Sequence, residues 1–167
     1  MMIMTTTNHA HGPAGRLEVR LTLPPTVRPG QVAVVCHPHP LFGGTMDNKV
    51  VTTTVRAYKE LGLPVVSFNF RGVGASAGIH DHGRGEVDDL LAVVDWAVAQ
   101  TGAQALYLAG FSFGSYIAAA AVGRLPLALK QLLLLAPPVH QHVMVLVLAL
   151  ALVVLVVLVV VVVVVPR

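Results

Sequence analysis

The sequence contains few charged residues, few aromatic residues and a single cysteine. Charged residues make up 11% and aromatic residues 5% of the 167 residues, and the formal net charge of +3 comes from scattered Lys and Arg rather than a basic stripe. This composition gives little support to nucleic-acid binding. Cys36 cannot form an internal disulfide, and no positively charged, then apolar leader opens the chain, so a cytoplasmic location is expected.

The apolar residues follow the periods of strands and helices in turn. The segment "RLEVRLTLP" (16–24) alternates apolar and polar residues, which predicts a half-buried strand. The segment "QVAVVCH" (31–37) is nearly all apolar, which predicts a strand buried on both faces. Further strands are predicted at 64–70, 105–109 and 131–138. The polar residues 1–15, with Gly and Pro, are expected to form a loose lead-in.

Helices are predicted between these strands. They are expected from Asp47 or Asn48 to about Leu61, over 85–100, and from Ser112 onward. In the helix 85–100 the apolar residues share one face, and Glu86, Asp89 and Gln100 are expected to lie largely away from it. The alternation predicts an α/β fold with a mainly parallel sheet flanked by helices, and residues 1–142 are expected to form one domain.

A serine stands between two glycines in "GFSFGSY" (110–116). The pattern G-x-S-x-G is typical of a nucleophile elbow, a sharp strand-to-helix turn that exposes a serine hydroxyl. Ser112 has this context, because an apolar run precedes it and a small-residue run follows it. The glycines would let backbones pass close to the turn. The spacing alone leaves open the alternative that Ser112 caps the start of a helix.

Ligands of a parallel sheet bind beyond the carboxyl ends of its strands. Four segments follow predicted strands, and they read "HPHPLFGGT" (37–45), "RGVGASAG" (71–78), "FSFG" (111–114) and "APPVHQH" (136–142). All four are rich in His, Gly, Ser and Pro. Their concentration at one edge favours an active site there and favours Ser112 as its nucleophile.

Four motifs follow one another along the chain, and they read "HPHPLFGGTMDNKVV" (37–51), "FNFRGVGAS" (68–76), "GRGEVDDLLAVVDW" (83–96) and "AGFSFGSY" (109–116). With these motifs in this order, the sequence resembles a group of small bacterial hydrolases in the α/β-hydrolase superfamily. The resemblance covers residues 16 to about 140. It implies a serine nucleophile acting on small acyl substrates, so Ser112 is the expected nucleophile of an esterase. No cofactor is expected.

Acyl transfer also needs preorganised donors for the oxyanion that forms. One is expected to be the backbone N–H of Phe113, the residue after the nucleophile. The other should come from the loop that begins at residue 37, where the two prolines lack an N–H, so His39 or Leu41 must supply it. His39 is favoured, because the prolines on either side would hold its N–H rigidly.

Several residues are expected to support these loops. Gly43 and Gly44 would let the chain turn away beneath the substrate, and His37 belongs to the same loop. The resemblance implies that "RGVGAS" is scaffold, so Arg71 and Ser76 are expected to brace the neighbouring loop. The alternative interpretation makes the histidines of the first loop ordinary surface residues of a proline-rich turn.

The glycine-rich turn and the histidines raise two other possibilities. The glycines of 71–78 are spaced G-x-G-x-x-x-G, which differs from the dinucleotide pattern G-x-G-x-x-G. All eight histidines fall in H-x-H pairs, namely His9/His11, His37/His39, His80/His82 and His140/His142. On a strand such a pair would suit a metal. The pairs are expected in loops, so no metal site is predicted.

The sequence lacks a recognisable acid and base after the serine. The superfamily's triad runs Ser, then Asp or Glu, then His. Here no acid follows Asp95, and the only later histidines are His140 and His142. The resemblance therefore supplies a nucleophile and an oxyanion hole but no triad. A catalytically inactive member of the fold, retained for binding, is the alternative function.

Residues 143–165 consist only of Val, Leu, Ala and Met. As one helix they would span about 35 Å, enough for a membrane anchor of either an enzyme or a binding protein. Their monotony resembles neither an evolved anchor nor the second half of a hydrolase. A chain truncated or misread after about residue 140, with Val and Leu standing for unidentified residues, explains it best. We predict that this segment packs against the sheet as strand or helix rather than projecting as one long helix.

Overall fold

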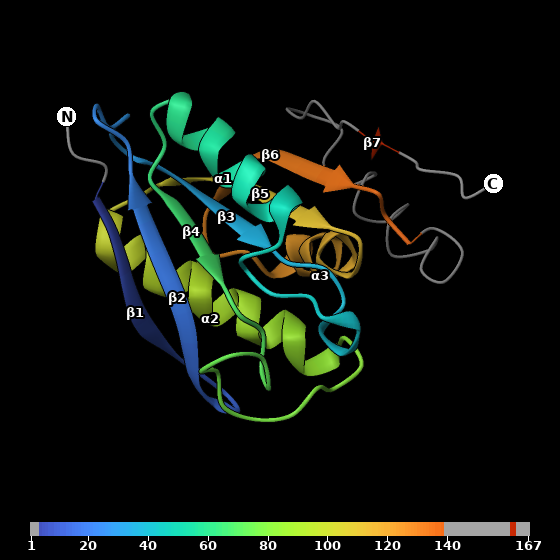
Figure 1. Ribbon diagram of the computed structural model, residues 1–167. Coiled ribbons are helices and arrows are strands. Elements are labelled where there is room, and N and C mark those ends of the chain that lie inside the picture. The colour runs from blue at the N-terminus through green and yellow to red at the C-terminus, as the bar shows by residue number, and fades with distance from the viewer. Residues whose placement is uncertain (1–3, 139–160, 163–167) are drawn as a thin grey trace.

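The computed structural model describes residues 4–138 and 161–162, which form one seven-stranded sheet with helices on both faces (Figure 1). The strands lie in the order β1-β2-β4-β3-β5-β6-β7. Their bounds are Met4–Gly12, Gly15–Leu23, Gln31–Cys36, Val65–Phe68, Ala105–Phe111, Ala128–Leu135 and Val161–Val162 for β1 to β7 in turn. Strands β3 to β7 are parallel, and β1 and β2 are antiparallel to their neighbours. The predicted fold class is confirmed.

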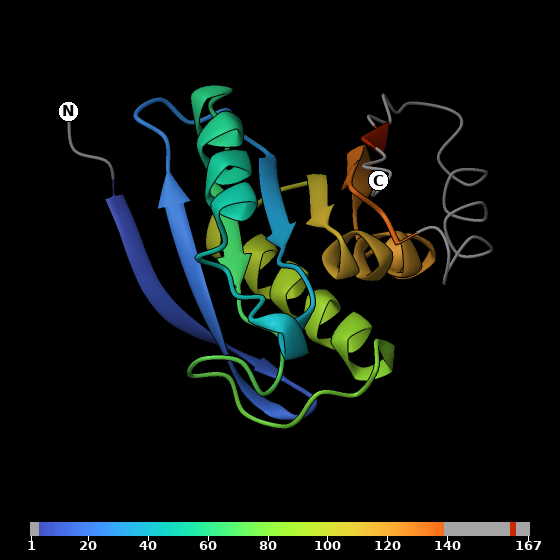
Figure 2. The ribbon, with the colours of Figure 1, turned by 45° about the vertical axis from the view of Figure 1, so that its right-hand side comes forward.

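Three α-helices cover the sheet. They are α1 (Lys49–Glu60), α2 (Arg84–Thr101) and α3 (Phe113–Ala121), and two short 3₁₀ helices, η1 (Pro40–Phe42) and η2 (Val122–Arg124), lie in connections. Helix α1 lies on one face, and α2 and α3 lie on the other (Figure 2). Of the two predicted caps of α1, Asn48 is the one used, since its Oδ1 accepts the Val50 N–H at 2.9 Å.

The central strand β3 is buried on both faces, as its apolar sequence predicts. Val32, Val34 and Cys36 belong to the core beneath α2 and α3. Ala33 and Val35 belong to a separate core beneath α1. Because side chains alternate along a strand, a strand covered by helices on both faces must be apolar throughout.

Two predictions about the strands need correction. The described part of the predicted lead-in, residues 4–15, is not loose, because Met4–Gly12 forms β1, a hairpin partner of β2 along its whole length. Most of β1 is exposed, so backbone pairing and β-branched threonines form it rather than an apolar face. The strand predicted at 131–138 begins three residues earlier and ends at Leu135.

The prediction that the acids of α2 lie away from its buried face is wrong. Glu86 and Asp89 are both fully buried. The prediction from the amphipathic pattern assumes that carboxylates are exposed to water. A carboxylate can also be buried when hydrogen-bond donors or a cation of the protein replace its water contacts. Those partners come from the loop before α2 and are described below.

The expectation for residues 143–165 falls mostly outside the described residues, as does the domain boundary at 142. Of that run, only Val161 and Val162 are described, and they pair in parallel with Leu134 and Leu135 as β7. Among the helices that the structure describes, none has the length and apolar character to cross a bilayer.

Candidate active site

Ser112 lies in a sharp turn between β5 and α3. Its backbone has φ 53° and ψ −116°. A non-glycine residue in such a conformation costs on the order of 1–3 kcal/mol and persists only where its surroundings hold it. The Ser112 N–H donates to the Leu135 carbonyl at 2.8 Å, which anchors the turn to β6. The strained strand-to-helix turn predicted from the motif is therefore present.

The two glycines of the motif allow this turn to pack closely. A Cβ on Gly110 would lie 2.2 Å from the Gly114 carbonyl oxygen, and a Cβ on Gly114 would lie 2.4 Å from that of Cys36. Neither position accepts a side chain without movement of the backbone. Because Gly114 touches the end of β3, the turn lies beside the loop that follows β3.

The elbow presents an unpartnered donor next to the Ser112 hydroxyl. Helix α3 begins at Phe113, so the N–H of Phe113 has no acceptor within the helix. Within the described residues it has no other acceptor either. The Ser112 carbonyl, in contrast, accepts both the N–H and the hydroxyl of Ser115, at 2.9 and 2.6 Å.

His37 joins the ends of β3 and β4. Its ring is fully buried, its Nδ1–H donates to the Pro38 carbonyl at 2.7 Å, and its Nε2 accepts the Phe70 N–H at 3.1 Å. Burial lowers the pKa of His37 to about 4, and the bond to Pro38 opposes this only in part. The ring is thus a neutral structural link, which excludes the alternative of a surface histidine at this position.

His39 lies half-buried at the start of η1. Its Nδ1 accepts the Leu41 N–H at 3.2 Å, and its carbonyl accepts the N–H groups of Phe42 and Gly44. The His39 N–H has no acceptor among the described residues. The His39 ring centroid lies 4.9 Å from that of Phe113, so this loop touches the elbow. The pKa of His39 is lowered by burial first and then by nearby imidazoles.

The two glycines of this loop serve the turn in different ways. Gly43 ends η1 in the left-handed conformation, with φ 78° and open space where a Cβ would lie. Gly44 is needed for close approach, since its Cβ would lie 2.2 Å from the Pro38 carbonyl oxygen. The chain therefore doubles back tightly beneath His39.

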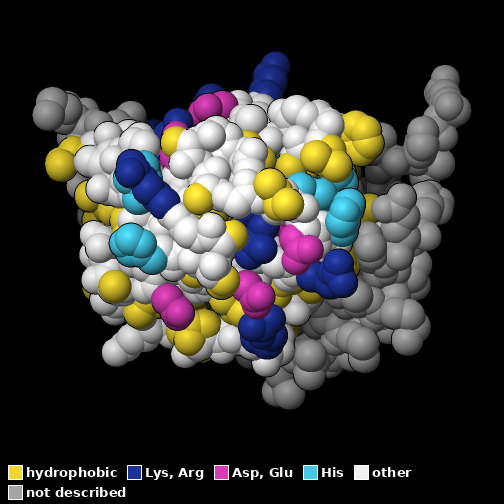
Figure 3. All heavy atoms as spheres, turned by 90° about the horizontal axis from the view of Figure 1, so that it is seen from below, with side chains coloured by type: hydrophobic (Ala, Val, Ile, Leu, Met, Phe, Trp, Pro, Cys, Tyr) yellow, Lys and Arg dark blue, Asp and Glu magenta, His cyan; other side chains and the backbone are white. Residues whose placement is uncertain are grey.

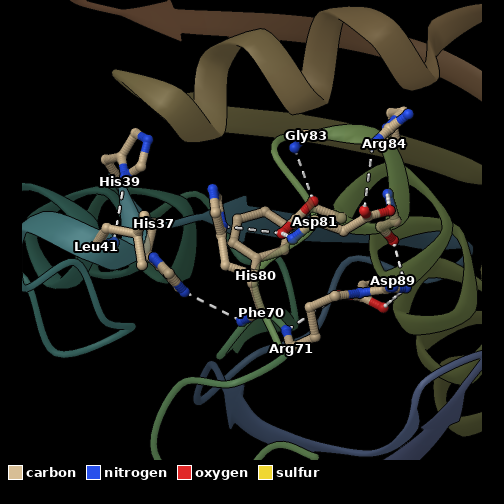
Figure 4. Close-up of polar contacts among 12 residues, drawn as sticks. His37, His39, Leu41, Phe70, Arg71, His80, Asp81, Gly83, Arg84 and Asp89 are labelled. Carbon is tan, nitrogen blue, oxygen red and sulfur yellow. Dashed lines mark hydrogen bonds and ion pairs between the residues drawn. The ribbon is translucent and has the colours of Figure 1, made fainter. Parts of the chain in front are cut away.

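Arg71 braces the loop after β4 through a carboxylate of α2. Its Nε and Nη2 donate to the two oxygens of Asp89 at 3.0 and 2.8 Å, and its backbone N–H donates to Asp89 at 3.0 Å. Nη2 also reaches the Gly85 carbonyl at 2.8 Å. Figure 4 shows this pair on one side of His80 and the His37 to Leu41 loop on the other.

Ser76 and Asn69 tie the same loop to its neighbours. The buried Ser76 hydroxyl donates to the Asn69 carbonyl at 2.7 Å and accepts the Glu18 N–H at 2.9 Å. The Asn69 side chain accepts the Met46 N–H at 2.9 Å and donates to the Glu18 carboxylate at 2.9 Å. Ser76 thus bonds to β2 and to the residue that follows β4, and Asn69 links the loops after β3 and β4.

Glu86 holds the last part of this loop against α2. Its two oxygens accept the N–H groups of Asp81 and Gly83 at 2.7 and 2.9 Å. His80 Nδ1 lies 3.0 Å from Glu86 Oε1. Sequence reasoning missed this role, although an acid at the third helical position is a known signal for a helix cap.

The described residues contain no acid or histidine after Ser112, and His140 and His142 lie outside them. Within the same residues, no group of three or more His, Cys, Asp or Glu side chains could hold a metal ion. The H-x-H pairs are not all in loops as expected, because His9 and His11 lie on β1. Burial raises the pKa of the Cys36 thiol, so Cys36 is a poor nucleophile.

This chain belongs to the alpha/beta hydrolase fold family, whose model matches residues 42–154. It is similar to an α/β serine hydrolase without lid from Xanthomonas campestris, at a TM-score of 0.75 and 47% identity over 83% of this chain and 63% of that one. It is also similar to an alpha-beta serine hydrolase homologue from Coxiella burnetii, at a TM-score of 0.75 and 48% identity over 83% and 66% of the two chains.

An uncharacterized protein of Rickettsia prowazekii is 42% identical over 131 residues, which make up 78% of this chain and 54% of that protein. The chain therefore spans less than two thirds of the length of each of these three relatives. The resemblance drawn from the four motifs is confirmed at the level of the family.

Proposed function

We propose that the protein is a serine hydrolase, an esterase that cleaves small carboxylic esters with Ser112 as its nucleophile. The observation that carries the proposal is the strained turn at Ser112 with the unpartnered N–H of Phe113 beside it. A turn of this kind exposes a serine hydroxyl next to an oxyanion donor. The serine hydrolases similar to this chain support the same class.

In the proposed reaction the Ser112 oxygen bonds to the ester carbonyl carbon, and its proton passes to a base. The alcohol leaves with a proton, and water then releases the acid from the acyl-enzyme. Among the described residues after Ser112 there is no acid or histidine to serve as that base. Ser112 is thus the proposed nucleophile, and backbone N–H groups are the proposed oxyanion donors.

The N–H groups of Phe113 and His39 are proposed to bind the oxyanion. Both are without acceptors among the described residues, and the two residues are in ring contact. The Leu41 N–H is a weaker candidate because it already donates to His39 Nδ1. Arg71 and Ser76 are proposed to hold the neighbouring loop rather than to touch substrate.

A fluorophosphonate probe, which reacts with activated serine hydroxyls, tests the nucleophile. We expect mass spectrometry to find the adduct on Ser112 and no adduct in Ser112→Ala. Thr53→Ala, an exposed change on α1, serves as the control and should be labelled normally. Hydrolysis of p-nitrophenyl acetate should fall at least about a thousandfold in Ser112→Ala. An adduct on another serine, or unchanged hydrolysis in this variant, would contradict the assignment.

The second candidate function is a binding protein that has lost catalysis. The missing acid and histidine after Ser112, within the described residues, favour it. The same experiment separates the two functions, since a folded wild-type protein that neither takes up the probe nor hydrolyses esters would fit only the second. A cytoplasmic location stays a prediction from the sequence.

A further inference from the structure

A cavity of about 400 Å³ opens between the loops that follow β3 and β4. Its lining residues come from η1, from the glycine-rich turn and from the approach to α2. They are Pro40 and Leu41 on one wall, Gly72, Val73, Gly78 and Ile79 on the other, and His80 and His82 at the end nearest α2. This size falls within the range of small-molecule pockets.

The cavity begins next to the proposed oxyanion donors. Leu41 in its wall donates its N–H to the His39 ring, and that ring lies 5.1 Å, centroid to centroid, from His80. His80 in turn lies 5.6 Å from the ring of Phe113. A substrate whose carbonyl oxygen is held by the N–H groups of His39 and Phe113 therefore has this cavity beside it.

Two large aliphatic side chains of the cavity lining, Leu41 and Ile79, are exposed to water. Leu41 is 63% and Ile79 83% exposed, and the adjacent Phe42 is 85% exposed. In the space-filling view from the side of these loops, hydrophobic side chains lie beside histidines (Figure 3). Large aliphatic side chains gathered in water around a cavity indicate an apolar ligand, because covering them releases their hydration water.

The wall after β4 is held in place before any ligand binds. The Arg71–Asp89 pair fixes its start, and Glu86 fixes its end through the N–H groups of Asp81 and Gly83. Glu86 also approaches His80, at 3.0 Å from Nδ1. Because this loop is already ordered, little conformational entropy is lost when a ligand binds, and the burial of apolar area contributes more fully to the binding free energy.

We propose that this cavity binds an aliphatic chain of the ester, between Leu41 on one loop and Ile79 on the other. This inference rests on the proposed function, because it takes the carbonyl group to lie at His39 and Phe113. The chain could belong to the acid or to the alcohol of the ester. The protein is thus an esterase that prefers esters with aliphatic chains longer than acetyl or methyl.

The test measures kcat/KM for two series of esters. One series lengthens the acid (p-nitrophenyl acetate, butyrate and hexanoate), and the other lengthens the alcohol (methyl, butyl and hexyl acetate). In wild type we expect kcat/KM to rise in one series by about two- to fourfold per methylene. In Leu41→Ala/Ile79→Ala that rise should flatten. Val27→Ala, which trims an exposed apolar side chain away from the cavity, should retain it.

Binding to Ser112→Ala separates this inference from the proposed function. Calorimetry should show methyl hexanoate or hexyl acetate binding at least about tenfold more tightly than methyl acetate, and this gain should vanish in Leu41→Ala/Ile79→Ala/Ser112→Ala. If binding depends on chain length but wild type hydrolyses no ester, the proposed esterase function is contradicted and the aliphatic binding site is supported. Hydrolysis without chain dependence in either series, or dependence that survives the wall substitutions, would overturn the site alone.

Discussion

The two loops that form the candidate site are held by different physical means. The loop after β3 is fixed by a neutral buried ring, His37, and by a glycine, Gly44, packed against backbone. The loop after β4 is fixed by buried charges, the pair Arg71–Asp89 and the carboxylate of Glu86. A neutral link is lost when it gains a proton, whereas a charged link is lost when one partner is removed. The two loops should therefore fail under different treatments.

The largest effect is expected from breaking the charged link. Asp89→Ala leaves the Arg71 guanidinium without its carboxylate in a nearly buried position, which should lower the free energy of unfolding by about 3 to 5 kcal/mol. Ester hydrolysis should fall with it, because Ile79 and His80 lie on the loop that this pair holds. Urea unfolding and p-nitrophenyl hexanoate hydrolysis measure the two effects.

Asp88→Ala is the matched control for this change. Asp88 is the preceding residue of α2, and its ion pair with Arg124 is exposed on both sides. Exposed pairs contribute little, so the expected loss is below about 1 kcal/mol. Equal losses in the two variants would show that the buried pair does not hold the loop.

The next largest effect is expected from acid at the neutral link. The pKa of His37 is about 4 in the folded protein and near 6.5 when unfolded, so the unfolded state gains the proton first as the pH falls. The stability from the neutral ring is complete above pH 6.5 and is lost towards pH 4, a change of about 3 kcal/mol. His39, whose pKa is also lowered, adds in the same direction.

His37→Gln checks this assignment. The amide of Gln can both donate and accept, but it does not titrate in this range. From pH 7 to pH 4, the unfolding free energy of wild type should fall by about 3 kcal/mol more than that of His37→Gln. A difference that stays constant across this range would mean that His37 does not titrate as a buried neutral ring.

The smallest effects are expected at the paired glycines of the first loop. Gly43→Ala should cost about 1 kcal/mol, because only its positive φ is unfavourable and the space for a Cβ is open. Gly44→Ala should cost about 2 kcal/mol and should also reduce hydrolysis, because the Cβ would displace the backbone under His39. Thermal unfolding and ester assays of both variants compare them, and a loss of activity in Gly43→Ala alone would contradict the geometry.

Parts of this site could be predicted from local sequence. The elbow at Ser112 follows from two glycines between an apolar strand and a small-residue helix, and the tight turn at Gly44 follows from paired glycines after prolines. The bracing by Arg71 and Ser76 came from the family resemblance, and the structure supplies partners for both. These features depend on neighbouring residues or recur within the family, so short sequence motifs are sufficient to predict them.

Other parts could not be predicted in this way. Helical periodicity predicted that Glu86 and Asp89 face outward, but both are buried. The pattern takes account of which residues are polar, and it does not show which hydrogen-bond partners from other elements surround them. His37 was open to interpretation as a surface residue, since its acceptor role depends on Phe70, which is 33 residues away in sequence. Strand β1 was missed because its formation depends on pairing with β2 rather than on an apolar face.

The sequence by itself determined the α/β class, the alternation of strands and helices from β2 to β6, and the backbone turn at Ser112. Each of these features depends on residues that are close together in the sequence. The period of the apolar residues sets the type of each element, and the backbone conformations that glycine and proline allow set the turns. Only the tertiary structure decided that Asp89 meets Arg71, that Glu86 faces inward and that His37 is neutral. The free energy of a buried charge or ring depends on partners from other elements, and those partners come together only when the sheet and helices pack.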